Sequence, residues 1–159
     1  MHATSTMRLT SKAFHDGDEI PMKYTVEGLD ISPPLTWSGI PAGTHSLALI
    51  VEDPDAPDPA APATVPWVHW VVSDLPPSLD GLPEDVRALR HGHIGVNDWQ
   101  NTAWNGPSPP KGTHRYVFRL YAIDRTLDLD RPSKHELEFA MRGHVIADAT
   151  LMGTYHRHH

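Results

Sequence analysis

The 159-residue chain contains no cysteine. This absence excludes disulfides, zinc–thiolate sites and cysteine nucleophiles. Positive charge is also scarce, because 13 Lys and Arg stand against 20 Asp and Glu and no basic cluster occurs. A nucleic-acid backbone is bound through concentrated positive charge, so we expect no nucleic-acid partner. The acidic balance also argues against non-specific attachment to anionic membranes.

Long apolar runs are missing as well, and we therefore expect no stable insertion into a membrane. The first residues, MHATSTMRLTSKAF (1–14), lack the basic and apolar regions of a secretory signal. This favours a cytoplasmic protein, although a processed periplasmic chain would read the same. The length predicts a single domain over 1–159, with a flexible tail at 156–159 that we leave out of the candidate site.

Proline and glycine are plentiful, with 16 and 11 copies spread along the chain. Such spacing punctuates short strands. In HRYVFRLYAID (114–124), Tyr116, Phe118, Leu120 and Ala122 alternate onto one face, as in a half-buried strand. The predicted strands are 22–28, 35–39, 46–52, 68–75, 114–124 and 149–155.

One helix is predicted near the C-terminus. Ser133 and Glu136 form a capping-box pattern, and Leu137, Ala140, Met141 and Val145 then recur at helical spacing: this pattern predicts a helix from residue 134 onward. PEDVRALRHG (83–92) is expected to form a short helical turn. Many strands followed by one helix predict a mainly β fold, with two packed sheets and a helix covering one end.

Three segments place polar side chains where a strand meets a proline-bearing loop. They are DPDAP (53–57), PWVH (66–69) and PSPPKGTHRY (107–116). Proline restricts φ, so such loops lose less entropy when they become ordered. If the three segments converge in space, they form a rigid pocket mouth.

Each residue also has a simple structural interpretation. Asp-Pro dipeptides commonly form turns, His69 is equally well explained as a satisfied core histidine, and Tyr116 as a core aromatic. We expect Arg115 to pair with a carboxylate and brace its loop. His91 and His93 are expected at the surface, and because no third ligand is near in sequence, they predict no metal site.

Together, DPDAP, WVHW (67–70) and GPSPPKGTHRYVFRLYAID (106–124) resemble the phosphatidylethanolamine-binding protein family, also called Raf-kinase-inhibitor-like proteins. SPPLTWSGIPAGTHSLALIVEDPDAP (32–57) and AMRGHVIADATLMGTY (140–155) resemble its small bacterial and archaeal branch. The resemblance implies a β-sandwich-like fold with a shallow anion-binding pocket at one end. We expect Asp55 and Arg115 to have structural roles behind this pocket. The pocket positions it implies are Asp53, Pro57, Trp67, His69, Pro109, Pro110, His114 and Tyr116.

Two residues depart from that branch. Many bacterial relatives carry Cys where this chain has Ser108, and Tyr where it has Trp104. The first change removes any redox role, and the second is expected to alter the pocket rim. Eukaryotic members extend further, with a helix that partly covers the pocket. This pocket is therefore expected to be more open, or to be closed by a partner subunit, and the bacterial relatives suggest a homodimer.

Two imidazoles facing one pocket can donate hydrogen bonds to phosphate or carboxylate oxygens. Asp53 can accept from a ring nitrogen and fix its tautomer, or stabilise the imidazolium. We therefore expect a non-catalytic module, without a cofactor, that binds phosphate, a phospholipid head group or a carboxylate and that has a regulatory role.

Two alternatives stay open. The first is a protein-contact inhibitor of a kinase or protease, which rests on family analogy alone and names no protein partner. The second is an enzyme, in which Asp53, His69 and His114 hold a metal or hydrolyse a phosphoester. Known nucleophile and phosphate-loop motifs are missing, so the enzyme is the less favoured of the two.

Overall fold

The computed structural model describes residues 6–61 and 64–158. Outside the described residues lie 1–5, at the start of the segment considered for a secretory signal, 62–63, and residue 159 of the predicted tail. The fold is mainly β, with two sheets and one C-terminal helix, as predicted. The smaller sheet has the order β1 (Arg8–Thr10), β2 (Leu35–Ser38), β5 (Gly81–Leu82). The larger has the order β6 (His93–Ile94), β4 (Trp67–Leu75), β3 (Ser46–Asp53), β7 (His114–Ile123), β8 (Val145–Tyr155).

The centre of the larger sheet is β3, which pairs antiparallel with β4 and β7. Every residue of β3 is buried, as expected for its continuous apolar run. The alternation in β7 also holds, because Tyr116, Phe118 and Leu120 are buried whereas Arg115 and Arg119 are exposed. One side of β7 therefore faces the core, and its first residues can deliver side chains to the end of the sheet.

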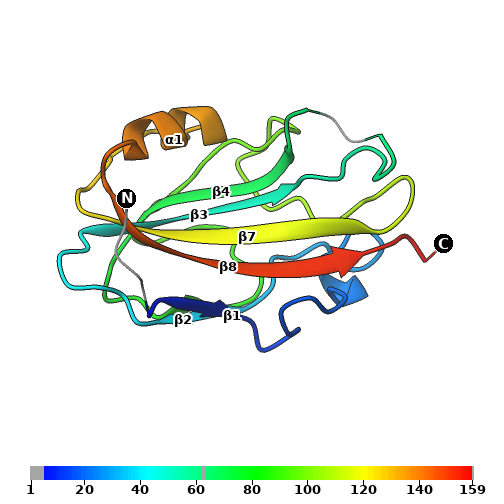
Figure 1. Ribbon diagram of the computed structural model, residues 1–159, viewed down its shortest axis with the longest axis horizontal. Coiled ribbons are helices and arrows are strands. Elements are labelled where there is room, and N and C mark those ends of the chain that lie inside the picture. The colour runs from blue at the N-terminus through cyan, green and yellow to red at the C-terminus, as the bar shows by residue number, and fades with distance from the viewer. Residues whose placement is uncertain (1–5, 62–63, 159) are drawn as a thin grey trace.

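Apolar side chains fill both sides of the larger sheet. Between the two sheets lie large residues such as Trp37, Trp70 and Phe118. On the opposite side, Leu137 and Met141 of α1 (Lys134–Met141) pack against the sheet. Figure 1 shows this layering, with α1 on one side of the larger sheet and β1–β2 on the other.

The N-terminus of α1 is closed by the predicted capping box. Ser133 Oγ accepts from the Glu136 N–H at 3.2 Å, and a Glu136 side-chain oxygen accepts from the Ser133 N–H at 3.1 Å. The helix ends earlier than its sequence pattern predicts. Gly143 has a φ of +82°, which stops the helical path, so Val145 begins β8 and does not continue the helix.

Two further local predictions are wrong. Within 22–28 the chain forms a short 3₁₀ helix, Met22–Tyr24, because Thr25 Oγ1 and N–H both donate to the Met22 carbonyl. Residues 83–92 form no helical turn. There Asp85 adopts a φ of +62°, and the Val86 N–H donates to Ser32 Oγ at 2.9 Å, so the segment bonds to another loop.

The outer edge of β8 is covered near its end by residues 17–20. Gly17 N–H donates to Met152 O at 2.7 Å, Ile20 N–H donates to Thr154 O at 2.8 Å, and Thr154 N–H donates to Asp18 O at 3.0 Å. The chain then leaves β8 at the end of the sheet where β7 starts (Figure 1). No helix in the described part of the chain is long and apolar enough to cross a bilayer.

The packing of α1 predicts a large difference between two of its residues. Leu137→Ala should lower the free energy of unfolding by about 2–5 kcal/mol, because a fully buried side chain leaves a cavity. Phe139→Ala, at a position 68% exposed, should change it by less than about 0.5 kcal/mol. Urea unfolding of both variants measures the difference, and equal losses would contradict the described helix face.

Candidate ligand-binding site

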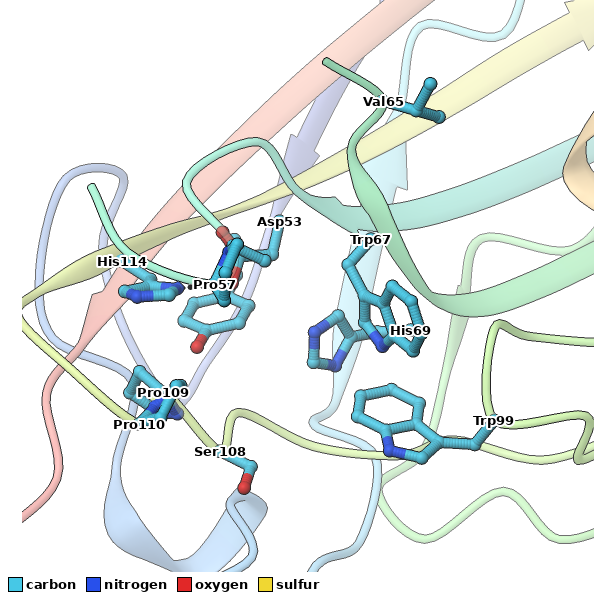
Figure 2. A pocket seen from close by; sticks show the side chains of 12 residues that line it. Asp53, Pro57, Val65, Trp67, His69, Trp99, Ser108, Pro109, Pro110 and His114 are labelled. Atoms are coloured by element: carbon cyan, nitrogen blue, oxygen red, sulfur yellow. Dashed lines mark hydrogen bonds and ion pairs between the residues drawn. The ribbon is translucent and has the colours of Figure 1, made fainter. Parts of the chain in front are cut away.

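A cavity of about 370 Å³ lies at one end of the larger sheet, where β3 ends and β4 and β7 begin. Its volume is in the range of small-molecule sites. Figure 2 shows Asp53, Pro57 and His114 on one side of this space and Trp67, His69 and Trp99 on the other. The structure brings all eight predicted pocket residues together. The lining residues are Asp53, Ala56, Pro57, Val65, Trp67, His69, Trp99, Ser108, Pro109, Pro110, His114 and Tyr116.

A buried pair joins the first and third motifs. His114 Nδ1 lies 2.6 Å from Asp53 Oδ2, and His114 Nε2 lies 2.8 Å from the Lys111 carbonyl. Both ring nitrogens therefore face acceptors: Nε2–H donates to Lys111, and one proton is shared with Asp53. Wherever that proton sits, the pair is neutral overall. Burial raises the pKa of Asp53, against the lowering effect of His114.

This arrangement changes the role expected for His114. The sequence suggested an N–H group directed at a ligand oxygen, but both nitrogens are taken by the protein. His114 thus contributes a fixed wall of the cavity and a tie between loops.

Asp55 and Arg115 form the predicted brace beside this pair. Arg115 donates from Nε and Nη2 to the two Asp55 carboxylate oxygens, each at 2.9 Å. Its backbone N–H donates to Asp55 as well, at 2.8 Å. Hydrogen bonds from Arg115 hold the pKa of Asp55 below its usual value. Two carboxylates at the end of β3 thus fix the first two residues of β7.

His69 is held as a neutral imidazole. Its Nδ1 lies 2.6 Å from the Asn105 carbonyl, which makes Nδ1 the donor and leaves the lone pair on Nε2. Burial lowers the pKa of His69 to about 4. The ring packs edge-on against Trp99 and Tyr116, with centroids 4.8 and 5.2 Å apart. One ring nitrogen of His69 points toward the Pro57 side of the cavity in Figure 2.

The loop that carries Asn105 is fixed by residues that sequence reasoning missed. Asn97 Nδ2 donates to the Asn105 side-chain oxygen at 2.7 Å, and Gly106 N–H donates to Asp30 Oδ1 at 2.7 Å. A Cβ at Gly106 would lie 2.3 Å from the Tyr24 carbonyl oxygen, so only glycine fits there. None of these contacts has a periodic signal, since each depends on how two loops meet.

Tyr116 supplies a hydroxyl proton without an acceptor. The hydroxyl is buried at the cavity, and although the Ser108 backbone N–H is directed at its oxygen, its proton has no acceptor among the residues that the structure describes. Burial raises the pKa of Tyr116, so the phenol keeps its proton. A buried hydroxyl normally finds a partner, which makes this group a candidate ligand contact.

The mouth of the cavity is apolar. Trp67 and Trp99 are 40% and 38% exposed and meet edge-to-face at 5.5 Å. Val65 is exposed beside them, and the prolines of two loops supply further walls without donors. Trp99 was not predicted, because a lone tryptophan in a polar loop carries no positional signal.

The enzyme alternative needs Asp53, His69 and His114 to converge on one metal ion. Within residues 6–61 and 64–158, two groups of three bring one ligand atom each within 4.8 Å of one another. They are Glu19 with His156 and His158, and Asp74 with His93 and Asp128. The three pocket residues do not form such a group, and the nitrogens of His114 are already engaged.

Residues 10–156 match the family described as phosphatidylethanolamine-binding protein. A UPF0098 protein of Methanothermobacter thermautotrophicus is 46% identical over 95% of this chain and 99% of its own length. The chain belongs to the phosphatidylethanolamine-binding protein family. Among solved structures, a homologue from Chlamydia trachomatis has 42% identity and a TM-score of 0.89, covering 97% of this chain and 99% of its own. Escherichia coli YbcL has 30% identity and a TM-score of 0.85, covering 95% and 98%.

The two departures from the bacterial branch of this family lie in different places. Ser108 lines the cavity. Trp104 does not, and the expectation that it alters the rim is wrong. It is buried, stacks on Phe118 with centroids 6.0 Å apart and donates from Nε1 to the Tyr24 carbonyl at 3.2 Å. Its bulk fills the core behind the cavity.

The C-terminal segment of this family member reaches the third motif. Arg157 Nη2 donates to Ser108 Oγ at 3.0 Å, and Arg157 Nε donates to the Pro109 carbonyl at 3.3 Å. A cationic side chain therefore rests on a loop that lines the cavity. Sequence reasoning left this residue out with the rest of the tail.

The Asp55–Arg115 brace predicts a pH-dependent loss of stability. Asp55→Asn should lower the free energy of unfolding by about 1–2 kcal/mol at pH 7, because a charge-assisted pair is lost from a half-exposed guanidinium. The folded pKa is depressed, so this contribution is present above the unfolded value of about 4 and is lost as the pH falls through the folded value.

Urea unfolding at pH 7 and pH 3 provides the measurement, and the loss should be smaller at pH 3. Asp130→Asn is the matched control, because the Asp130 side chain is 97% exposed. A loss that is equal at both pH values would show that the carboxylate charge has no part in the brace.

Proposed function

We propose that the cavity binds a small anion that also carries one acidic proton, with hydrogen phosphate and phosphate monoesters as the fitting class. The observation that carries the proposal is the buried Tyr116 hydroxyl, which lines the cavity and has no acceptor for its proton in the described chain. A donor held in that state is suited to an oxygen of a bound ligand.

The second polar contact has the opposite character. The Nε2 atom of His69 carries a lone pair, since Nδ1 donates to Asn105 and the ring is neutral. A ligand that satisfies both groups must accept from Tyr116 and donate to His69. The second pKa of a phosphate monoester is about 6, so close to neutral pH it still offers both a P–O⁻ acceptor and a P–OH donor.

Other anions satisfy only half of this pattern. A carboxylate with an ordinary pKa of about 4 is unprotonated at neutral pH, and a phosphodiester has no P–OH group. Either ligand would place acceptors against the lone pair of His69. A free head-group monoester such as phosphoethanolamine therefore suits the cavity better than the diester of an intact phospholipid.

The charges near the cavity and its apolar walls favour a small anion. The Asp53–His114 pair is neutral overall, and Arg157 places a positive charge on the Ser108–Pro109 loop. Burial raises the pKa of Tyr116, and the charge of Arg157 acts in the opposite direction, which indicates that Arg157 favours negative charge near that hydroxyl. Proline and tryptophan walls leave room beside the anion for a short apolar substituent.

The test is an NMR titration of the chain with methyl phosphate and with dimethyl phosphate at pH 6. Methyl phosphate should shift the His69 ring signals to saturation and bind at least about tenfold more tightly than the diester, because the diester lacks the P–OH donor. Equal affinities for the two esters would contradict the proposal.

Tyr116→Phe should weaken methyl phosphate binding about tenfold or more, the usual effect of losing one hydrogen bond to a charged group. Tyr121→Phe is the matched control, since Tyr121 lies on the opposite face of β7, against the core that includes α1. Affinity retained in Tyr116→Phe, or lost to the same extent in Tyr121→Phe, would remove the hydroxyl from the site.

The affinity for methyl phosphate should fall between pH 6 and pH 8. Over this range His69 stays neutral, because its pKa is about 4, while the ligand loses its P–OH proton at about pH 6. The same titration repeated at the two pH values measures the change. Tighter binding at pH 8 would mean that the dianion is bound and that the assigned donor pattern is wrong.

The predicted homodimer, the protein-contact inhibitor, the regulatory role and the hydrolase stay predictions.

A further inference from the structure

Two histidines of the C-terminal segment converge on one carboxylate oxygen away from the cavity. His158 Nε2 lies 2.7 Å from Glu19 Oε1, and His156 Nδ1 lies 3.6 Å from the same atom. The centroids of the two imidazole rings are 4.4 Å apart. An ordinary surface ion pair needs one histidine, whereas here two ring nitrogens and one carboxylate oxygen lie within 4.8 Å of one another.

The backbone around this group is fixed by other bonds. Asp18 and Ile20, on either side of Glu19, are tied to Thr154 at the end of β8. Beyond β8, the His158 N–H donates to a Glu27 carboxylate oxygen at 2.8 Å, and the buried Tyr155 hydroxyl donates to the same atom at 2.7 Å. The positions of Glu19 and His158 therefore do not depend on the contact between them.

We propose that Glu19, His156 and His158 form a binding site for a divalent transition-metal ion of the zinc class. Imidazole nitrogens and a carboxylate oxygen are the ligands that such ions use. Tetrahedral zinc, at about 2.0–2.2 Å from each ligand, sets the ligand atoms about 3.3–3.5 Å apart. The observed separations of 2.7 and 3.6 Å to Glu19 lie on either side of that spacing.

Three protein ligands leave the fourth position of a tetrahedral ion to water. All three side chains are exposed, so the ion reaches the site directly from solvent. The site therefore has the open coordination of a removable ion, and its affinity rests on the three named side chains.

A second group of possible ligands has a different explanation. Asp74 lies 3.5 Å from His93, but its two carboxylate oxygens already accept the backbone N–H groups of Leu127 and Asp128 at 2.8 and 2.7 Å. Asp74 thus holds a loop in place. This group provides an internal comparison for the first, because it contains one histidine and two carboxylates where the first contains two histidines and one carboxylate.

The proposed site has a direct structural effect. In the sequence, Arg157 lies between the two histidine ligands, and its side chain contacts the Ser108–Pro109 loop. An ion bound to both neighbours would hold the backbone of Arg157 against that loop. Metal binding is thus expected to move the NMR amide signals of Arg157 and Ser108, whether or not the cavity binds phosphate.

The experiment is a calorimetric titration of the full chain with zinc chloride in a non-chelating buffer. The wild type should show one strongest site at a ratio of one ion per chain. His156→Ala, His158→Ala and Glu19→Gln should each weaken that site by at least about tenfold, since each removes one of three ligands. All three positions are exposed, and circular dichroism of each variant checks that the fold is kept.

His135→Ala and His93→Ala are the matched controls. His135 is an exposed histidine of α1, and His93 belongs to the Asp74 group. Both variants should bind zinc as the wild type does. Full affinity in Glu19→Gln would mean that the tail histidines alone take the ion, and loss in His93→Ala would move the ion to Asp74. Either result, or the absence of a one-to-one site, would overturn the proposal.

Discussion

The contact between Asp53 and His114 joins the end of β3 to the start of β7 without access to water. A buried ion or a buried unpaired polar group costs free energy, so each partner is tolerable only because the other is present. The Lys111 carbonyl completes the set by taking the second ring nitrogen. The proline-rich loop before β7 is thereby tied to the central strand, and the cavity forms where these two elements meet.

Beside this tie, two polar side chains that line the cavity, His69 and Tyr116, each have a defined protonation state. His69 is fixed in one tautomer by a backbone carbonyl, and Tyr116 keeps its proton because burial opposes ionisation. The surrounding walls are proline and tryptophan, which add no competing acceptor. In the function proposed above, recognition rests on the Tyr116 donor and the His69 acceptor. For such a ligand, we expect the protonation state to matter more than the charge alone.

Much of this arrangement could be predicted from the sequence. The apolar run of β3, the alternation of β7 and the capping box of α1 are local signals, and each produced the expected element. The convergence of the three proline-bearing motifs was predicted from their position at strand ends and from the family resemblance. All eight predicted pocket positions line one cavity for that reason.

The rest depended on contacts between segments that carry no periodic signal. Trp99, Asn97 and Asn105 act from irregular loops, and the engagement of both His114 nitrogens depends on the direction of one carbonyl. Val145 fits the helical spacing of α1, and only the left-handed Gly143 assigns it to β8. From the sequence, the tail at 156–159 was left out of the candidate site. Its described residues nevertheless contact Ser108, Glu19 and Glu27.

The segment at residues 17–20 has a consequence for contacts between copies of the chain. An open strand edge is a template on which another chain can add a strand. Over residues 152–154 of β8 the outward carbonyls of Met152 and Thr154 and the N–H of Thr154 are already bonded within the chain. A second copy therefore cannot add a strand to this part of the β8 edge.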